Sequence, residues 1–494
     1  MSRMKRIFDF MLISSSSFAI IITIINLGNF SSGYEYTVLL QPLFLMLYLI
    51  FIRQILFKTN LIITYLFLGI SFIRYIFGPL LISITGVGES IPYFQISEES
   101  LKLALFLMMW EMVALNICFY IFAKYFVKRI KEKDILPIPK LLGNQTYYIF
   151  IILMGLIVFI LFGYGENLVN FIVITVQDGR HGDLDDTRLV LIRQILISAV
   201  AMAFLLIIMK LFKLYSRNHN KLLYYLAVAA SFVHIGIIIG ERRSIQLYTA
   251  FVSIFLLTTF FKKYKKNTII TILSFAFLVF MFMSIYKFNS AFLYNSYSEA
   301  LVENEVNIKE YSGYVQAYFQ GVQNVGVTIN MKDSVRTSLF QVLYDHGRSF
   351  FGINFMLKGL MPTTSDLFNT FIYGRYMPSG HVISGIGYGY INLGFLLAPL
   401  FVILNLLVAF FCEFKMKTVL SLEMRYIYSY IFIRFIISLF SSTPPLINIA
   451  TILLGTLGLI YLVAEIFNLP SKKRHKFIIR NKKVFSNNTD KNFT

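Results

Sequence analysis

The sequence predicts an all-α polytopic membrane protein with about twelve transmembrane helices, both termini in the cytoplasm and one large external loop. Of the 494 residues, 57% are hydrophobic and only 14% are charged, and the mean hydropathy is +0.70. The apolar residues come in blocks of about twenty, the length at which a helix crosses the hydrocarbon layer. Soluble domains do not need this much apolar surface, so a water-soluble protein is excluded.

Transmembrane helices are expected where apolar blocks are separated by charged, Pro or Gly residues. The first block is too long for a signal peptide and no small-x-small cleavage site follows it, so we expect it to remain as an anchor. The spans form two membrane bundles, 1–288 and 384–467, and a basic cytoplasmic tail covers 468–494. They lie near residues 7–28, 37–57, 60–84, 100–123, 147–165, 189–212, 222–240, 245–261, 268–288, 384–411, 426–442 and 446–467.

The distribution of charge orients these spans. The net charge is +20, and most Lys and Arg stand in short runs between apolar blocks, as they do in cytoplasmic loops. With Arg3, Lys5 and Arg6 inside, the other basic loops also fall inside, while most acidic residues fall outside or within spans. Because membrane topology accounts for the charge, we expect no nucleic-acid partner.

Two external stretches are longer than turns, at about 166–188 and 289–383. The second is expected to pack as a small domain over the membrane, and its later part has the Tyr, Phe, Gly and Pro content of an interfacial cap. We find no sequence repeat that relates the two halves of the chain, which weakens the hypothesis of an inverted-repeat transporter.

Arginines on the external side oppose the positive-inside rule and therefore need another explanation. Arg presents a fixed fork of donors that matches phosphate oxygens, and it stays charged at physiological pH. We therefore expect an external cavity for an anionic headgroup, although a solvated turn paired with Glu241 is an alternative for the Arg242–Arg243 pair. The external arginines that we single out are Arg180, Arg188, Arg193, Arg242, Arg243, Arg348 and Arg375.

Charges near the centres of spans are costly unless they are paired. Arg74 and Glu111 lie at similar depth on adjacent spans, which predicts a structural ion pair. Arg434 has no obvious partner in its span and is a candidate for lining a cavity. His234, on an apolar helix, is expected to be a hydrogen-bonded packing residue.

Two further motifs are candidates for chemistry. The loop at 178–186 contains an Asp-x-Asp sequence, which holds a divalent metal in many soluble glycosyltransferases. Here it is expected on the face away from nucleotide sugars, so we predict a hydrogen-bonding loop, no metal and no other cofactor. His381 lies before a Gly-rich start of a span, where it can act as a general base, with capping or packing as the alternative.

The passage at 378–394 resembles a segment of the Wzy-type O-antigen and capsule repeat-unit polymerases, which carry Tyr-x-Asn-x-Gly at the start of a late span. It reads ProSerGlyHisValIleSerGlyIleGlyTyrGlyTyrIleAsnLeuGly. GlyGluArgArg at 240–243 is similar to the same family, and the likeness in layout covers nearly the whole chain. The chain departs from the family shortly before Tyr390, where Gly387 and Tyr388 replace an expected acidic residue.

The resemblance implies a glycosyltransferase of the bacterial cytoplasmic membrane. Such a polymerase joins oligosaccharide repeat units, carried on undecaprenyl or another polyprenyl diphosphate, into O-antigen, capsule or exopolysaccharide on the outer face. The implied partners are the lipid bilayer, a flippase and a chain-length regulator. The alternatives are a lipid-linked oligosaccharide flippase or transporter, and a ligase that moves finished glycan to another acceptor.

The resemblance also implies roles for the candidate residues. Arg243 and Arg348 would stabilise the departing diphosphate, and His381, His346 or His181 would take the proton of the acceptor hydroxyl. The remaining candidates would bind the substrate. They are Arg180, Arg188, Arg193, Glu241, Arg242, Arg375, Tyr390, Asn392 and Arg434.

Overall fold

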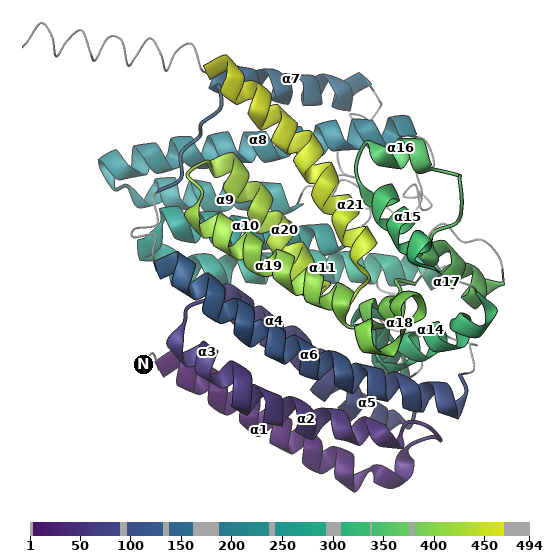
Figure 1. Ribbon diagram of the computed structural model, residues 1–494. Coiled ribbons are helices and arrows are strands. Elements are labelled where there is room, and N and C mark those ends of the chain that lie inside the picture. Colours follow the sequence, from purple (N-terminus) through teal and green to yellow (C-terminus); the bar gives the residue numbers. More distant parts are fainter. Residues whose placement is uncertain are drawn as a thin grey trace, which may run out of the picture. The chain divides into compact units, whose positions relative to one another are not determined.

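The described part of the chain is helical, with no named strand, in the computed structural model (Figure 1). The all-α class is therefore confirmed for this part. The structure describes residues 3–88, 96–131, 138–161, 187–236, 243–292, 308–335, 338–374 and 381–468, with side chains left out at a few positions within helices.

Apolar helices identify a membrane protein, as predicted. Seven helical stretches of the described part are long and apolar enough to cross a membrane, and a bent pair of helices adds an eighth. Three shorter apolar helices lie at Gln145–Leu161, Lys221–Gly236 and Ile245–Phe260. The count of twelve spans and their orientation stay predictions. The seven stretches are Arg3–Ile25, Glu35–Lys58, Ile62–Thr85, Glu98–Ile130, Gln194–Asn218, Lys262–Met281 and Thr443–Asn468.

The chain divides into two compact units, which we describe separately. Unit 1 comprises Met1–Leu136, Val302–Thr418 and Tyr428–Ile452. Unit 2 comprises Pro137–Leu301, Val419–Ile427 and Leu453–Thr494.

The membrane helices of unit 1 pack through aromatic side chains. They are α1 (Arg3–Ile25), α2 (Leu40–Leu47), α3 (Arg53–Lys58), α4 (Ile62–Phe72), α5 (Gly78–Thr85), α6 (Glu98–Lys131) and α19 (Leu400–Thr418). The ring of Phe119 on α6 stacks on Phe67 of α4 at 4.6 Å and meets Phe410 of α19 edge-on at 5.0 Å. Such close packing matters because lipid tails give no hydrophobic force between helices.

Two buried charges of unit 1 form an ion pair, and a buried carboxylate caps a helix. Arg74 and Glu111 are fully buried and lie 2.7 Å apart, which confirms the predicted ion pair. The Tyr75 hydroxyl also donates to Glu111, at 2.9 Å. The carboxylate of Glu413 on α19 accepts the first backbone N–H groups of α4, from Ile62 at 2.6 Å and Ile63 at 3.1 Å. An anion there satisfies free N–H groups at the positive end of a helix.

The span predicted over 384–411 is not one straight helix, because the chain bends by 106° between α18 (Gly385–Leu397) and α19. Gly394 has φ +79°, a conformation that favours glycine. Pro399, just before α19, lacks the N–H group that a continuing helix needs. The Gly-rich sequence of α18 also has a packing role: a Cβ on Gly389 would lie 2.0 Å from the carbonyl oxygen of Ala398.

The long loop of unit 1 is built from helices that include α13 (Ile308–Tyr318), α14 (Val322–Ser334), α15 (Leu339–Ser349), α16 (Ile353–Leu357) and α17 (Thr364–Tyr373). The helix α14 packs against α6 and α18. On α15 and α16, large apolar side chains point outward: Phe340 is 66% exposed and Met356 is 79% exposed. Lipid or another partner can cover such residues, and the interfacial cap stays a prediction.

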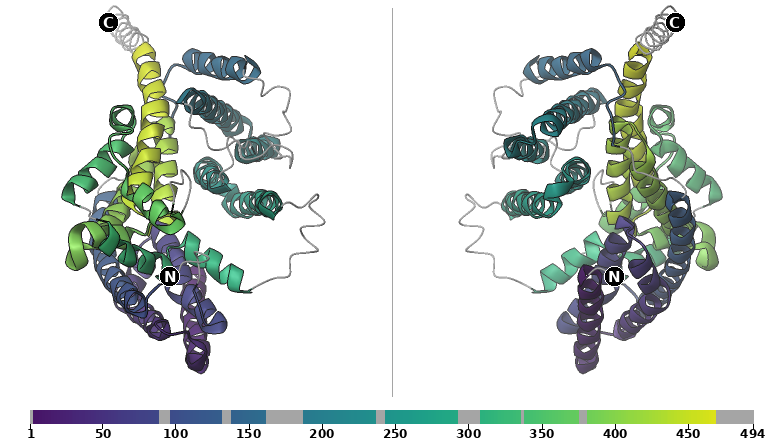
Figure 2. Two further views of the ribbon diagram at one scale, coloured as in Figure 1. Left: turned by 90° about the vertical axis from the view of Figure 1, so that its right-hand side faces the viewer. Right: turned by 90° about the vertical axis from the view of Figure 1, so that its left-hand side faces the viewer.

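Unit 2 contains α7 (Gln145–Leu161), α8 (Thr187–Asn218), α9 (Lys221–Gly236), α10 (Arg243–Phe260) and α11 (Lys265–Phe292). Neighbours in sequence are neighbours in space, and the blue-to-teal helices of Figure 2 follow one another in chain order. His234 on α9 is buried, with its ring nitrogens 3.2 Å from the Ser253 hydroxyl and 3.0 Å from the Tyr426 hydroxyl. Its predicted role as a hydrogen-bonded packing residue is confirmed.

Candidate functional site

The candidate site lies in unit 1, where α15 packs against α17 and α18. The sequence DHGR places Asp345, His346 and Arg348 within one turn of α15, and Tyr388 faces them from α18. We call these four residues the α15 site. Three come from predicted motifs or their neighbours, but sequence reasoning missed Asp345.

The start of α18 is held in place by a buried amide. The side-chain oxygen of Asn324 on α14 accepts the N–H of Ser384, and its nitrogen donates to the carbonyl of Val382, both at 2.9 Å. The hydroxyl of Ser384 then caps the helix by accepting the N–H of Gly387 at 3.1 Å. A Cβ at Gly387 would lie 2.8 Å from the hydroxyl of Thr328, so glycine permits α18 to approach α14.

Asp345 is the buried centre of the α15 site, with 2% exposure. Its carboxyl group accepts hydrogen bonds from the hydroxyls of Thr364 (2.5 Å) and Tyr388 (3.0 Å). The side-chain amide of Gln341 donates at 3.0 Å and the backbone N–H of Thr364 at 3.2 Å. Burial raises the pKa of Asp345, while the hydrogen bonds from Thr364, Gln341 and Tyr388 lower it, and the balance is a raised pKa.

The hydrogen bond between Tyr388 and Asp345 concerns the acidic residue that the resemblance to Wzy-type polymerases leads us to expect before Tyr390. The acidic residue expected shortly before Tyr390 is replaced by Tyr388, yet the Tyr388 hydroxyl donates to a carboxyl group that lies 43 positions earlier in the chain. A carboxyl group is therefore present beside this motif, supplied by α15. The only sequence signal was the position of Asp345 directly before His346.

His346 has one ring nitrogen available for chemistry. Its Nδ1 lies 2.8 Å from the carbonyl oxygen of Val342, which accepts a proton but cannot donate one. The hydrogen bond therefore assigns a proton to Nδ1, so Nε2 is the ring nitrogen left for other contacts. The ring stacks on Phe401 at 5.4 Å, lies 6.2 Å from the ring of Tyr388 and is half-buried. An imidazole oriented in this way is suited to proton transfer through Nε2.

Arg348 reaches the start of α17. Its guanidinium Nη1 lies 3.4 Å from a carboxylate oxygen of Asp366, and both side chains are partly exposed. Asp366 also completes a capping box with Thr363. Arg348 thus connects α15 to α17, and its remaining N–H groups are the ones available to an anion.

His381 lies just before α18 and packs on another ring. It stacks on Tyr373 at 6.0 Å, and its backbone carbonyl accepts a hydrogen bond from Asn369 at 3.2 Å. Burial lowers the pKa of His381, which keeps the ring neutral. His381 thus packs on Tyr373, and its role as a general base stays a prediction.

The motif residues Tyr390 and Asn392 have local partners. The ammonium group of Lys332 on α14 lies 4.1 Å from the ring centre of Tyr390, a cation–π contact. The Asn392 side chain donates to the carbonyl of Tyr388 at 2.9 Å, one turn back on the same helix. Arg434 is half-buried on α20 (Leu422–Ile437).

The structure describes no side chain for several predicted site residues, and some of these residues lie outside the described ranges altogether. Arg188 and Arg193 lie on α8 and Arg243 begins α10, but nothing is described of their side chains. The others are Arg180, His181, Glu241, Arg242, Arg375 and the Asp-x-Asp loop at 178–186. Within the described ranges, no group of three His, Cys, Asp or Glu residues is placed to hold a metal ion.

Taken together, the α15 site offers a proton acceptor at His346, a cation at Arg348 and a buried carboxyl group that fixes Tyr388. These groups can activate a hydroxyl nucleophile and bind an anion. Comparison with known proteins identified no matching family model, curated protein or solved structure.

Proposed function

We propose that this protein is a bacterial membrane glycosyltransferase that joins polyprenyl-diphosphate-linked oligosaccharide repeat units on the outer face of the cytoplasmic membrane. The observation that carries the proposal is the contact between α15, with its Asp-His-x-Arg sequence, and the Tyr-x-Asn-x-Gly helix α18. A proton acceptor and a cation there supply what the transfer of a sugar from a diphosphate needs.

In the proposed reaction, a hydroxyl group at the non-reducing end of the acceptor attacks the anomeric carbon of the donor. A glycosidic C–O bond forms while the bond from the anomeric carbon to the diphosphate oxygen breaks. The lipid diphosphate leaves with that electron pair, and Nε2 of His346 takes the proton of the hydroxyl group. Arg348, with Arg375 as a further candidate, stabilises the negative charge that develops on the leaving group.

Asp345 has a positioning role in this proposal. It is too buried to meet a sugar, and its hydrogen bonds connect α15 to Thr364 on α17 and to Tyr388 on α18. Fixing these helices keeps His346 and Arg348 at a constant separation from the motif helix. Such preorganisation removes the need to reorder the groups during the reaction.

The surface beside the α15 site supports a lipid-linked substrate. Leu339, Phe340 and Leu343 point outward from α15, opposite the buried Asp345, and Met356 on α16 is also exposed. An outward apolar face next to polar catalytic groups suits a substrate with an isoprenoid tail and a sugar head. The tail can stay in the membrane while the head reaches His346.

The direct test is synthesis by the purified protein. The full chain, reconstituted in lipid vesicles with polyprenyl-diphosphate-linked repeat units, should produce a ladder of longer lipid-linked glycans without nucleotide sugars or an energy source. His346→Asn should abolish the ladder, whereas His219→Asn, a matched change at an exposed histidine between α8 and α9, should preserve it. Equal ladders from both variants would exclude His346 as the base.

A transporter of lipid-linked oligosaccharides is the second candidate, and the broken helix favours it. Transporters commonly bind their substrate where a membrane helix is interrupted, as between α18 and α19. The same vesicles distinguish the two functions, because a flippase would move the carrier to the other leaflet and form no glycosidic bond. A glycan ligase would form the bond only when a different acceptor is supplied.

A further inference from the structure

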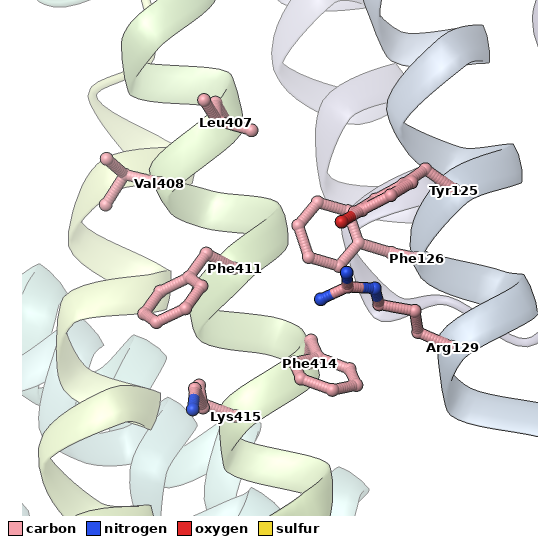
Figure 3. Close-up of a pocket in the computed structure, with 8 residues that line it drawn as sticks. All are labelled: Tyr125, Phe126, Arg129, Leu407, Val408, Phe411, Phe414 and Lys415. Atoms are coloured by element: carbon pink, nitrogen blue, oxygen red, sulfur yellow. The ribbon is translucent and has the colours of Figure 1, made fainter. Parts of the chain in front are cut away.

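We infer that a pocket between α6 and α19 binds an anionic phospholipid of the membrane. The pocket has a volume of about 470 Å³ and lies within unit 1 (Figure 3). Its apolar part comes mainly from aromatic side chains, and Arg129 and Lys415 bring two cations to it. This volume falls in the usual range for small-molecule sites, about 300–1,000 Å³.

The apolar part of the pocket contains both buried and exposed aromatic side chains. Phe126 on α6 is buried, and its ring stacks on Phe410 at 5.8 Å and lies 5.9 Å from Phe414. By contrast, Tyr125 is 50% exposed and Phe411 is 43% exposed, although both line the pocket. Large aromatic rings left open on membrane helices provide a surface on which an acyl chain can lie.

The two cations lie near the C-terminal ends of their helices. The guanidinium group of Arg129 lies 4.6 Å from the ring centre of Tyr125, and the ammonium group of Lys415 lies 5.3 Å from that of Phe411. Each cation thus lies over one of the two exposed rings of the pocket, Tyr125 or Phe411. Among the described residues neither cation forms an ion pair. The nearby Lys417, by comparison, is paired with Glu413 at 2.5 Å.

This arrangement has the polarity of a phospholipid. Two cations near one end can bind a phosphate, because charge-assisted hydrogen bonds to phosphate are strong. The other residues that line the pocket are uncharged, so they offer no binding group for a free phosphate or a second anion. In the predicted topology the C-terminal ends of α6 and α19 face the cytoplasm, where the leaflet surface is anionic. The occupant is therefore a membrane lipid with a phosphate headgroup.

The pocket is separate from the α15 site. Lys415 lies fifteen positions after Leu400, so it is about 22 Å along α19 from the end that adjoins α18, at 1.5 Å per residue. The lipid bound there is thus a structural lipid of the bundle and not the sugar carrier. It would hold the far ends of α6 and α19 together while the other ends position α18.

A lipid titration tests this inference on the purified full chain in detergent. Dioctanoyl phosphatidylglycerol should raise the thermal unfolding midpoint, and dioctanoyl phosphatidylcholine should do so much less. The double variant Arg129→Gln/Lys415→Gln should bind phosphatidylglycerol about 30-fold more weakly, the loss expected for two basic groups near an anionic lipid. Lys124→Gln/Lys128→Gln, which removes two cations of α6 that do not line the pocket, should keep wild-type affinity.

A second variant tests the apolar part independently of charge. Val408→Trp adds a large ring to the pocket lining and should also weaken phosphatidylglycerol binding, while both cations remain. Unchanged affinity in the Arg129/Lys415 variant, or an equal loss in the Lys124/Lys128 control, would overturn the inference. A midpoint shift of the same size with inorganic phosphate alone would also overturn it, because the site would then be an ion site.

Discussion

Removing the hydroxyl of Tyr388 tests whether the contact between α15 and α18 positions the site. In Tyr388→Phe the ring remains in its buried place and only the donor to Asp345, 3.0 Å away, is lost. A hydrogen bond to a charged group contributes about 1.5–3 kcal/mol. Asp345 keeps the donors of Thr364 and Gln341, so we expect a loss near 1.5 kcal/mol, the lower end of that range.

A loss of this size has a measurable consequence for function. If the contact preorganises the site for the transition state, its loss raises the activation free energy by about 1.5 kcal/mol, which corresponds to roughly a tenfold change in rate. The initial rate of glycan elongation in reconstituted vesicles should then fall by about tenfold. The assay is a time course of ladder formation at saturating lipid-linked substrate.

The matched control is Tyr75→Phe. Tyr75 is also buried and donates to a buried carboxylate, that of Glu111 at 2.9 Å, and this pair lies outside the α15 site. Both variants should lower the thermal unfolding midpoint by similar amounts, but only Tyr388→Phe should slow elongation. Equal elongation rates in the two variants would refute the positioning role of the Asp345–Tyr388 contact.

Three further predictions concern packing, pH and the buried ion pair. Gly389→Ala should greatly reduce the amount of folded protein on size-exclusion chromatography, because its Cβ meets backbone at 2.0 Å. Gly69→Ala should be tolerated, since nothing lies within 4 Å, and normal yields of both would contradict the close approach. The raised pKa of Asp345 means that the folded state holds this proton more tightly than the unfolded state, so stability should fall as pH rises from 3.8 through the folded-state pKa. The thermal unfolding midpoint, measured across acidic pH, should lose this pH-dependent decrease in Asp345→Asn. Identical pH profiles of the wild type and the variant would rule out a contribution from Asp345. Arg74→Met should lower the free energy of unfolding by about 3–5 kcal/mol, because Glu111 remains buried without its partner. The thermal unfolding midpoint should fall accordingly. Arg74→Met/Glu111→Leu should recover most of that loss, and an equally unstable double variant would argue against a charge effect.

The class of the fold was predictable because it depends on composition and on the length of apolar blocks, and both are local properties of the sequence. The ion pair of Arg74 and Glu111 was predictable for a related reason. Two charges within adjacent apolar blocks have few ways to avoid the cost of burial. The bend between α18 and α19 was missed because hydropathy remains high across it, although Gly394 and Pro399 mark the place.

The centre of the α15 site could not be predicted from the sequence. Asp345 gains its importance from Tyr388, which lies 43 positions later, and from Thr364, which lies 19 positions later. No periodicity relates these residues, and only the packing of α15, α17 and α18 brings them together. The motif residues around Tyr390 were found from their sequence, but their partners, such as Lys332, follow from tertiary packing.

The carboxylate of Glu413 has a consequence for biogenesis. It completes the start of α4 by accepting the N–H groups of Ile62 and Ile63, which lie about 350 positions earlier in the chain. At 5–20 residues per second, a ribosome needs about 20–70 s to make that intervening stretch. During this interval the third membrane segment must wait in the bilayer with water or headgroups on its free amides. The early segments of this protein therefore finish maturing only when translation is nearly over.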